Sequence, residues 1–80
     1  MSEPILVDAR GHRCPVPSLR LRKAMQGLAP GVRLTLLVTD PMARIDVPYL
    51  MADLGGTVCG IEAQDGALRI IVETGGVPTG

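Results

Sequence analysis

The chain has 80 residues, enough for one domain, and we expect a single domain over residues 1–80 with an ordered core from about residue 4 to residue 74. Hydrophobic residues make up 46% of the chain, but Tyr49 is the only aromatic residue, so a nucleic-acid binder that stacks bases on aromatic side chains is disfavoured. The formal net charge is zero, but the charges are unevenly distributed. Six basic and two acidic residues precede position 40, and two basic and six acidic residues follow from position 40 on, so the two halves carry opposite net charges.

The first half of the chain predicts a strand, a helix and a second strand. Residues 5–7 are a short apolar run that ends at Asp8, as in a strand. A helix over residues 15–28 is predicted by apolar residues at helical spacing, namely Leu21, Ala24, Met25 and Leu28. Pro15 suits the first turn of this helix, and the Gly- and Pro-containing turn at residues 27–31 ends it. Residues 33–39 alternate partly in polarity and predict the second strand.

A second helix is predicted over residues 41–54. Asp40 followed by Pro41 is a helix-start signal, with Asp40 as the cap. Pro48 interrupts the segment, so we expect either a bent helix or one turn followed by a proper helix. In the second case, Asp46 would cap the helix where it restarts.

Residues 57–64 and 67–74 predict two strands, joined by Asp65-Gly66 as a hairpin turn. The element order β-α-β-α-β-β predicts an α+β fold, a two-layer α/β sandwich with two helices on one face of a four-stranded mixed sheet. The last strand is the most apolar and is therefore placed in the centre, which gives the strand order 1-2-4-3. The uncovered face of the sheet is expected to carry Leu37, Arg69 and Ile71.

Cys14 stands where the first loop meets the first predicted helix. If Pro15 is the first helical residue, Cys14 is the N-cap, and its sulfur meets the positive end of the helix macrodipole. Positive field is added by Arg10, His12 and Arg13, while Pro15 and Pro17 stiffen the backbone. Helix N-termini and basic neighbours lower a cysteine pKa from about 8.5 to about 3.5–7.5, so we expect a thiolate at neutral pH. A buried structural cysteine is the alternative interpretation.

The surroundings of Cys14 favour a group carrier over other cysteine chemistry. A dithiol oxidoreductase needs a nearby resolving cysteine, but position 17 is proline. A cysteine hydrolase needs an oriented histidine base, and His12, the single histidine, has no evident orienting group. A zinc site needs about four ligands, so no metal is expected. Cys59 falls in step with Ile61 and Ala63, which predicts that it lies in the core.

The chain carries the pattern Asp8-x-Arg10-Gly11-x-x-Cys14-Pro15-x-Pro17, followed by Arg22-Lys23, Pro30-Gly31 and Asp40-Pro41-x4-Asp46-Val47-Pro48. In these motifs, and over about residues 5–74, it resembles the TusA/SirA family of sulfur carriers. The resemblance implies a fold similar to the C-terminal domain of translation initiation factor 3. It also implies that Cys14 accepts sulfur as a persulfide, with no other cofactor. The chain departs from many relatives at His12 and Ser18, where an apolar residue is common.

The resemblance further implies two kinds of protein partner. Relatives take sulfur from a cysteine desulfurase or a rhodanese-like donor and pass it to acceptors in tRNA thiolation, molybdenum cofactor supply or sulfur oxidation. For partner contact we expect three residues of the first helix, the exposed Leu19 and the basic Arg22 and Lys23. An adaptor domain that binds partners through this basic helix, without covalent chemistry, is the alternative function. No signal peptide, membrane span or disulfide framework is evident, so we expect a cytoplasmic protein with neither membrane nor nucleic acid as partner.

Overall fold

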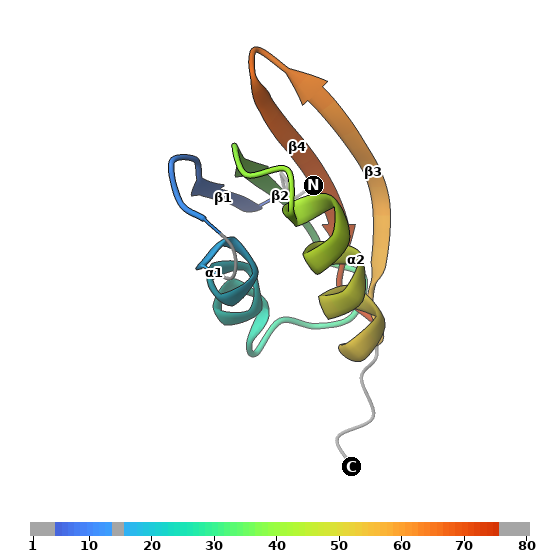
Figure 1. Ribbon diagram of the computed structural model, residues 1–80. Helices are drawn as coiled ribbons and strands as arrows, with labels where there is room; N and C mark the ends of the chain where they lie inside the picture. Colours follow the sequence, from blue (N-terminus) through green and yellow to red (C-terminus); the bar gives the residue numbers. More distant parts are fainter. Residues whose placement is uncertain (1–4, 14–15, 76–80) are drawn as a thin grey trace.

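The structure, a computed structural model, describes residues 5–13 and 16–75. Within these residues the chain forms the strands and helices labelled in Figure 1, which are β1 (Ile5–Ala9), α1 (Val16–Met25), β2 (Arg33–Val38), α2 (Ala43–Asp53), β3 (Thr57–Gln64) and β4 (Ala67–Glu73). The predicted order of elements is confirmed.

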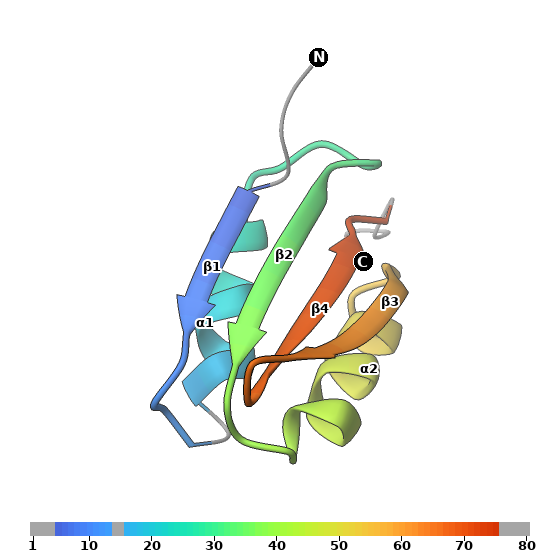
Figure 2. The same ribbon diagram turned by 90° about the horizontal axis from the view of Figure 1, so that it is seen from above.

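The strands form one mixed sheet in the order β1-β2-β4-β3. β1 is parallel to β2, and β4 lies between β2 and β3, antiparallel to both. Figure 2 shows the sheet from its open side, with the helices on the opposite side. The predicted two-layer α+β fold with strand order 1-2-4-3 is therefore confirmed. β4 occupies a central place because its alternate residues Leu68, Ile70 and Val72 are buried.

An aliphatic core fills the space between the sheet and the helices. The sheet supplies Ala9, Leu34, Leu36, Val38, Leu68, Ile70 and Val72, and the helices supply Leu21, Ala43, Val47 and Met51. The helical stripe predicted for α1 is confirmed, since Leu21 is fully buried and Ala24, Met25 and Leu28 pack against the core. This packing holds α1 on the sheet and so determines where its N-terminus lies.

Helix α1 ends earlier than predicted, at Met25 rather than residue 28. Gly27 has a φ of +78°, a left-handed conformation that glycine adopts without strain and that ends a helix. The N–H of Leu28 donates to the Met25 carbonyl oxygen in the closing turn. Leu28 contacts the core although it lies beyond the last helical residue. The apolar spacing therefore predicted a helix that was too long.

Helix α2 is continuous from Ala43 to Asp53, with Pro48 inside it. The prediction that Asp46 caps a restarted helix is wrong, because Asp46 lies in the first turn of this helix. Pro48 lacks only one backbone N–H, and the buried side chains of Val47 and Met51 on either side of it keep the helix on the sheet. The N-cap of α2 is Met42, so the prediction that Asp40 caps this helix is wrong. Asp40 Oδ1 instead accepts the N–H of Met42 at 2.9 Å in the turn before the helix.

A bulge in the edge strand β3 overturns the prediction for Cys59. Val58 pairs with Val72 and Gly60 pairs with Ile71, so Cys59 is an extra residue without a partner in β4. The extra residue changes the alternation of the strand, and Cys59 is exposed rather than part of the core. Spacing counted back from Ile61 could not reveal this, because the bulge depends on the pairing with β4.

Candidate functional site

The candidate site lies at the carboxyl ends of β1 and β2. These strands are parallel, so the loops that follow them meet at the same edge of the sheet. The two loops line a shallow, open cleft with residues Gly11, His12, Arg13, Thr39, Asp40 and Pro41. Cys14 directly follows the first of these loops in the chain, but Cys14 and Pro15 lie outside the described residues. The predicted N-cap position of Cys14 therefore stays a prediction.

The loop after β1 is a turn held by hydrogen bonds on three successive backbone N–H groups. The N–H of Arg10 donates to Asp8 Oδ1 at 3.1 Å, and that of His12 donates to the Ala9 carbonyl oxygen at 3.3 Å. Between them, the Gly11 N–H donates to Thr39 Oγ1 at 2.9 Å. Gly11, the third residue of this turn, has a φ of +82°, which is the value of a type II turn and which glycine adopts without strain.

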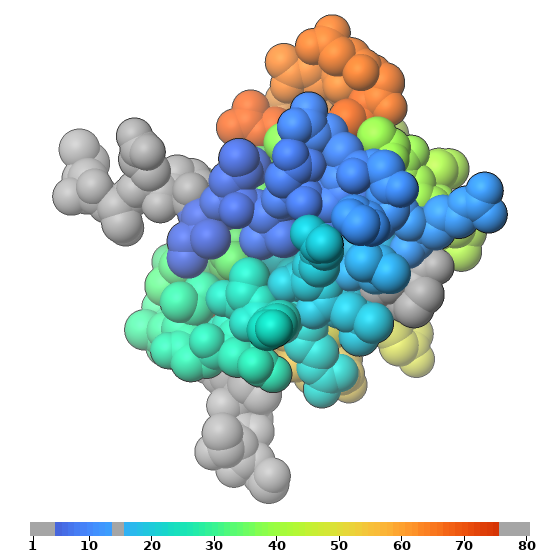
Figure 3. Space-filling model, turned by 90° about the vertical axis from the view of Figure 1, so that its left-hand side faces the viewer, coloured from blue at the N-terminus to red at the C-terminus, as the bar shows by residue number. Residues whose placement is uncertain are grey.

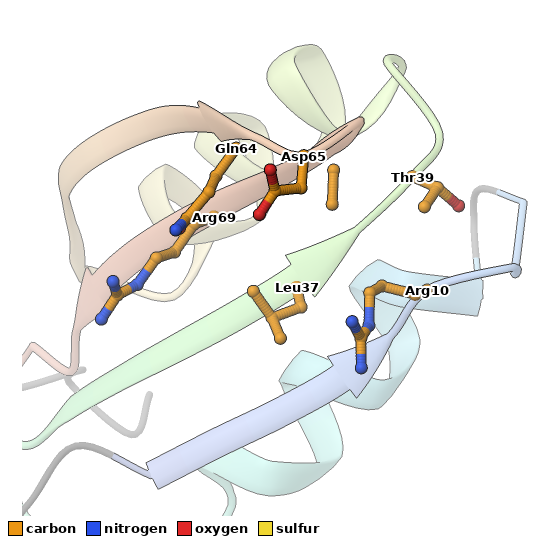
Figure 4. A pocket seen from close by; sticks show the side chains of 7 residues that line it. Arg10, Leu37, Thr39, Gln64, Asp65 and Arg69 are labelled. Carbon is orange, nitrogen blue, oxygen red and sulfur yellow. The ribbon is translucent and has the colours of Figure 1, made fainter.

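Arg10 forms an ion pair with Asp8 instead of lining the cleft. Its Nε lies 2.9 Å from Asp8 Oδ1, and its Nη2 lies 2.7 Å from Asp8 Oδ2. The side-chain hydrogen bond from Arg10, helped by the backbone N–H of Arg10, lowers the pKa of Asp8 to about 2. Arg10 lines a second hollow, on the open face of the sheet, together with residues Leu37, Thr39, Gln64, Asp65, Ala67 and Arg69 (Figure 4). The predicted support of Cys14 by Arg10 stays a prediction. The charge of Arg10 is already paired with the Asp8 carboxylate.

His12 and Arg13 are the basic residues that the structure does bring to the cleft. His12 is half-buried and Arg13 is exposed. Within the described residues, Arg13 makes no ion pair. Asp40, in the facing loop, also lines the cleft. The cleft is therefore lined by two basic residues from the loop after β1 and by an acidic residue from the loop after β2.

The N-terminus of α1 lies close to the cleft in the chain. The Val16 N–H donates to the Arg13 carbonyl oxygen at 2.9 Å, and Val16 is the first residue of α1 that the structure describes. Pro17 is fully buried in the first turn, so it anchors the start of the helix in the core. Within the described residues, the buried Oγ of Ser18 makes no hydrogen bond, which explains why an apolar residue suits this position.

The predicted partner-binding residues lie on the outside of α1. Leu19 is 57% exposed, and Arg22 and Lys23 are exposed in the last turn. Figure 3 shows β1, the loop after it and α1, coloured blue to cyan, as one continuous surface. Other large apolar side chains are exposed on the two helices or directly before α2, namely Val16, Met42, Ile45 and Tyr49. We call Leu19 and these four residues the apolar helical surface.

Arg22 has acidic neighbours that the sequence did not predict. It lines a hollow between α1 and α2 with residues Ser18, Asp46, Tyr49, Leu50 and Asp53. The outside of the helical layer therefore combines apolar groups with charges of both signs. Lys23 does not line this hollow.

The sequence model described as "Sulfurtransferase TusA" matches residues 5–74 of this chain. The chain belongs to the TusA family. A family member from Pseudomonas paraeruginosa, named "Sulfur carrier protein TusA", is 36% identical over 69 residues, which cover 84% of this chain and 85% of the relative. A relative from Archaeoglobus fulgidus, whose name also describes a sulfur carrier protein, is 40% identical over 68 residues, with 84% of this chain and 88% of the relative covered.

A solved structure agrees with TusA family membership. The SirA-like protein from Desulfitobacterium hafniense superposes with a TM-score of 0.79 at 27% identity, covering 89% of this chain and 97% of its own. These relatives support a sulfur-carrier role for the chain. Within the described residues, no helix is long and apolar enough to cross a membrane, and no group of three or more His, Cys, Asp or Glu residues is placed to hold a metal ion.

Thr39 is a site residue that the sequence analysis missed. It is the polar residue directly after β2, and it contacts the loop after β1. Its position at the carboxyl end of a strand parallel to β1 was the available signal. Reading that signal required knowing that β1 and β2 are neighbours in the sheet.

Proposed function

We propose that the protein carries sulfane sulfur as a persulfide on Cys14, taking it from a donor protein and passing it to an acceptor protein. The observation that carries this proposal is the place of the Cys14 loop. It leaves β1 beside a cleft lined by His12 and Arg13 and leads directly into the N-terminus of α1. The names of the TusA relatives support a sulfur-carrier role, and the persulfide and its location are our own inference.

The transfer needs only a thiolate and an accessible persulfide. The Cys14 thiolate attacks the outer sulfur of the donor persulfide and forms a new S–S bond. The old S–S bond breaks, and its electron pair leaves with the donor sulfur, which becomes a thiolate. An acceptor thiolate then attacks the outer sulfur on Cys14 and restores the Cys14 thiolate. The helix macrodipole and Arg13 favour the anionic sulfur in each step.

Partner contact is proposed for the apolar helical surface together with Arg22 and Lys23. A relay protein must present its reactive sulfur inside an interface, and exposed apolar side chains near the Cys14 loop provide area for one. The donor proposed is a cysteine desulfurase or a rhodanese-like protein. The acceptor proposed is a protein of a sulfur pathway such as tRNA thiolation, and we place the relay in the cytoplasm.

Sulfur loading of two single-cysteine variants tests the proposal. The protein is incubated with a cysteine desulfurase and cysteine, and intact mass is measured. Wild-type protein and Cys59→Ser are expected to gain the mass of one sulfur atom, whereas Cys14→Ser gains none. Cys59→Ser is the matched control because Cys59 is an exposed thiol that could itself accept sulfur.

The same variants separate a carrier from an adaptor. An adaptor that binds partners through its basic helix tolerates Cys14→Ser, because no covalent step passes through that residue. Loading that persists in Cys14→Ser and disappears in Cys59→Ser would overturn the assignment of the carrier residue.

A further inference from the structure

We propose that Thr39 is a positioning residue, whose hydroxyl holds the turn that precedes Cys14 in the chain against the end of β2. This inference rests on the proposed function, since it concerns the reactivity of Cys14. Thr39 does not contact the transferred sulfur in the proposal. It acts through the backbone of Gly11, which precedes Cys14 by three residues.

The turn after β1 has one central donor that it does not satisfy by itself. In a four-residue turn over Ala9 to His12, the hydrogen bond runs from the His12 N–H to the Ala9 carbonyl oxygen. The N–H of Gly11 takes no part in that bond and can bond elsewhere. Thr39 Oγ1 provides it at 2.9 Å, across a sequence separation of 28 residues.

The other bonds of this turn are local, and the Thr39 bond is not. The Arg10 N–H is bonded to Asp8 and the His12 N–H to Ala9, so both bonds stay within β1 and its turn. The bond from Gly11 ties the turn to the end of β2, which a different part of the chain supplies. Figure 4 shows the Thr39 oxygen directed towards the loop after β1. Thr39 therefore sets where the turn lies relative to the cleft.

The position of the turn bears on Cys14 through the short chain that follows. Arg13 is held by the bond from the Val16 N–H at the start of α1. Gly11 and Arg13, on the N-terminal side of Cys14, are thus both held by hydrogen bonds, to Thr39 and from Val16. Loss of the Thr39 bond would free the backbone three residues before Cys14, and we expect the reactivity of Cys14 to change with it.

Two substitutions separate the hydroxyl from the shape of Thr39. Thr39→Val keeps the branched side chain but removes the acceptor, and Thr39→Ser keeps the acceptor but removes a methyl group. In the Cys59→Ser background, we expect Thr39→Val to slow iodoacetamide alkylation and persulfide loading of Cys14 by about 2- to 10-fold. This range of rates corresponds to the net free energy of one hydrogen bond. Thr39→Ser is expected to stay within about twofold of the unsubstituted rate.

Amide exchange measured by NMR gives a readout that needs no sulfur donor. The Gly11 amide is expected to exchange faster with solvent in Thr39→Val, and Thr39→Ser should restore its protection. Unchanged amide spectra for the core residues of β2 and β4 would show that the fold is kept in both variants.

Failure of this inference is distinct from failure of the proposed function. If unsubstituted protein does not load sulfur, the carrier function is wrong, and the alkylation rates and Gly11 exchange still decide the role of Thr39. Equal alkylation in Thr39→Val and unsubstituted protein overturns the positioning role. So does a Thr39→Ser variant as slow as Thr39→Val, because the hydroxyl would then not be the cause.

Discussion

Arg10 forms an ion pair with Asp8 instead of lining the cleft. The guanidinium meets both carboxylate oxygens of Asp8, and the Arg10 backbone N–H adds a third bond to the same carboxylate. The charge of Arg10 is therefore balanced two residues away, on the open face of the sheet. Arg13 has no ion pair within the described residues and lines the cleft, so we propose Arg13 rather than Arg10 as the arginine that favours a thiolate at Cys14.

The Asp8 carboxyl is expected to titrate at unusually low pH. Its pKa lies at about 2, below the ordinary value of 3.8, because the charged form accepts hydrogen bonds from Arg10. A lowered pKa in the folded state adds stability that is fully present above pH 3.8 and is lost as pH falls towards 2. NMR titration of the Asp8 side-chain carboxyl measures this midpoint.

Arg10→Met provides the control for that titration. It removes the guanidinium and should move the Asp8 midpoint back towards 3.8. A wild-type midpoint near 3.8 would contradict the fork-shaped contact between the two side chains.

In the central strand β2, neighbouring side chains lie on opposite faces of the sheet. Leu36 is fully buried against the helices, and Leu37 is half-buried on the open face beside Arg69. The edge strand β3 departs from such regularity because its bulge turns Cys59 outward. An edge strand tolerates the bulge since only one of its sides is bonded to a neighbour.

Alanine substitution of these two leucines should separate the two faces. Leu36→Ala is expected to lower the free energy of unfolding by about 2–5 kcal/mol, because it leaves a cavity in the core. Leu37→Ala, the matched control in the same strand, should cost about 1 kcal/mol, because the open face has no second layer of packing to lose. Urea denaturation of both variants measures the difference. Equal losses would contradict the assignment of faces.

At the scale of the whole molecule, α1 packs on β1, on β2 and on α2. Its sequence runs from the residues that follow the cleft to the basic residues of its last turn, Arg22 and Lys23. The basic residues are not isolated, because α2 brings Asp46 and Asp53 next to Arg22. Steering of a partner therefore depends on a local pattern of charges rather than on the net charge, which is zero.

Charge reversal on α1 should slow association with a sulfur donor. Arg22→Glu with Lys23→Glu is expected to lower the association rate constant with a desulfurase by about tenfold at low salt and to weaken its salt dependence. Arg33→Glu with Arg69→Glu changes the net charge equally but lies on the sheet, and should have a smaller effect. Stopped-flow fluorescence at several salt concentrations measures both. Association that responds to neither double substitution nor to salt would show that these charges are only solvated surface.

The sequence by itself determined the order and type of the elements, the strand order and the loop that carries Cys14. These features depend on local patterns, such as the spacing of Leu21, Ala24 and Met25 on α1 and the Asp65-Gly66 turn, which act within a few residues. The residue types around Cys14 likewise pointed to a carrier before any geometry was known.

Only the tertiary structure decided which side chains meet. The bond between Gly11 and Thr39 joins residues far apart in sequence, the bulge at Cys59 depends on pairing with β4, and the continuity of α2 through Pro48 depends on packing against the sheet. Each of these is a contact between elements, whose free energy depends on partners that local spacing cannot reveal. For that reason the candidate residues of the loop after β1 could be named from the sequence, but the contact between Gly11 and Thr39 could not.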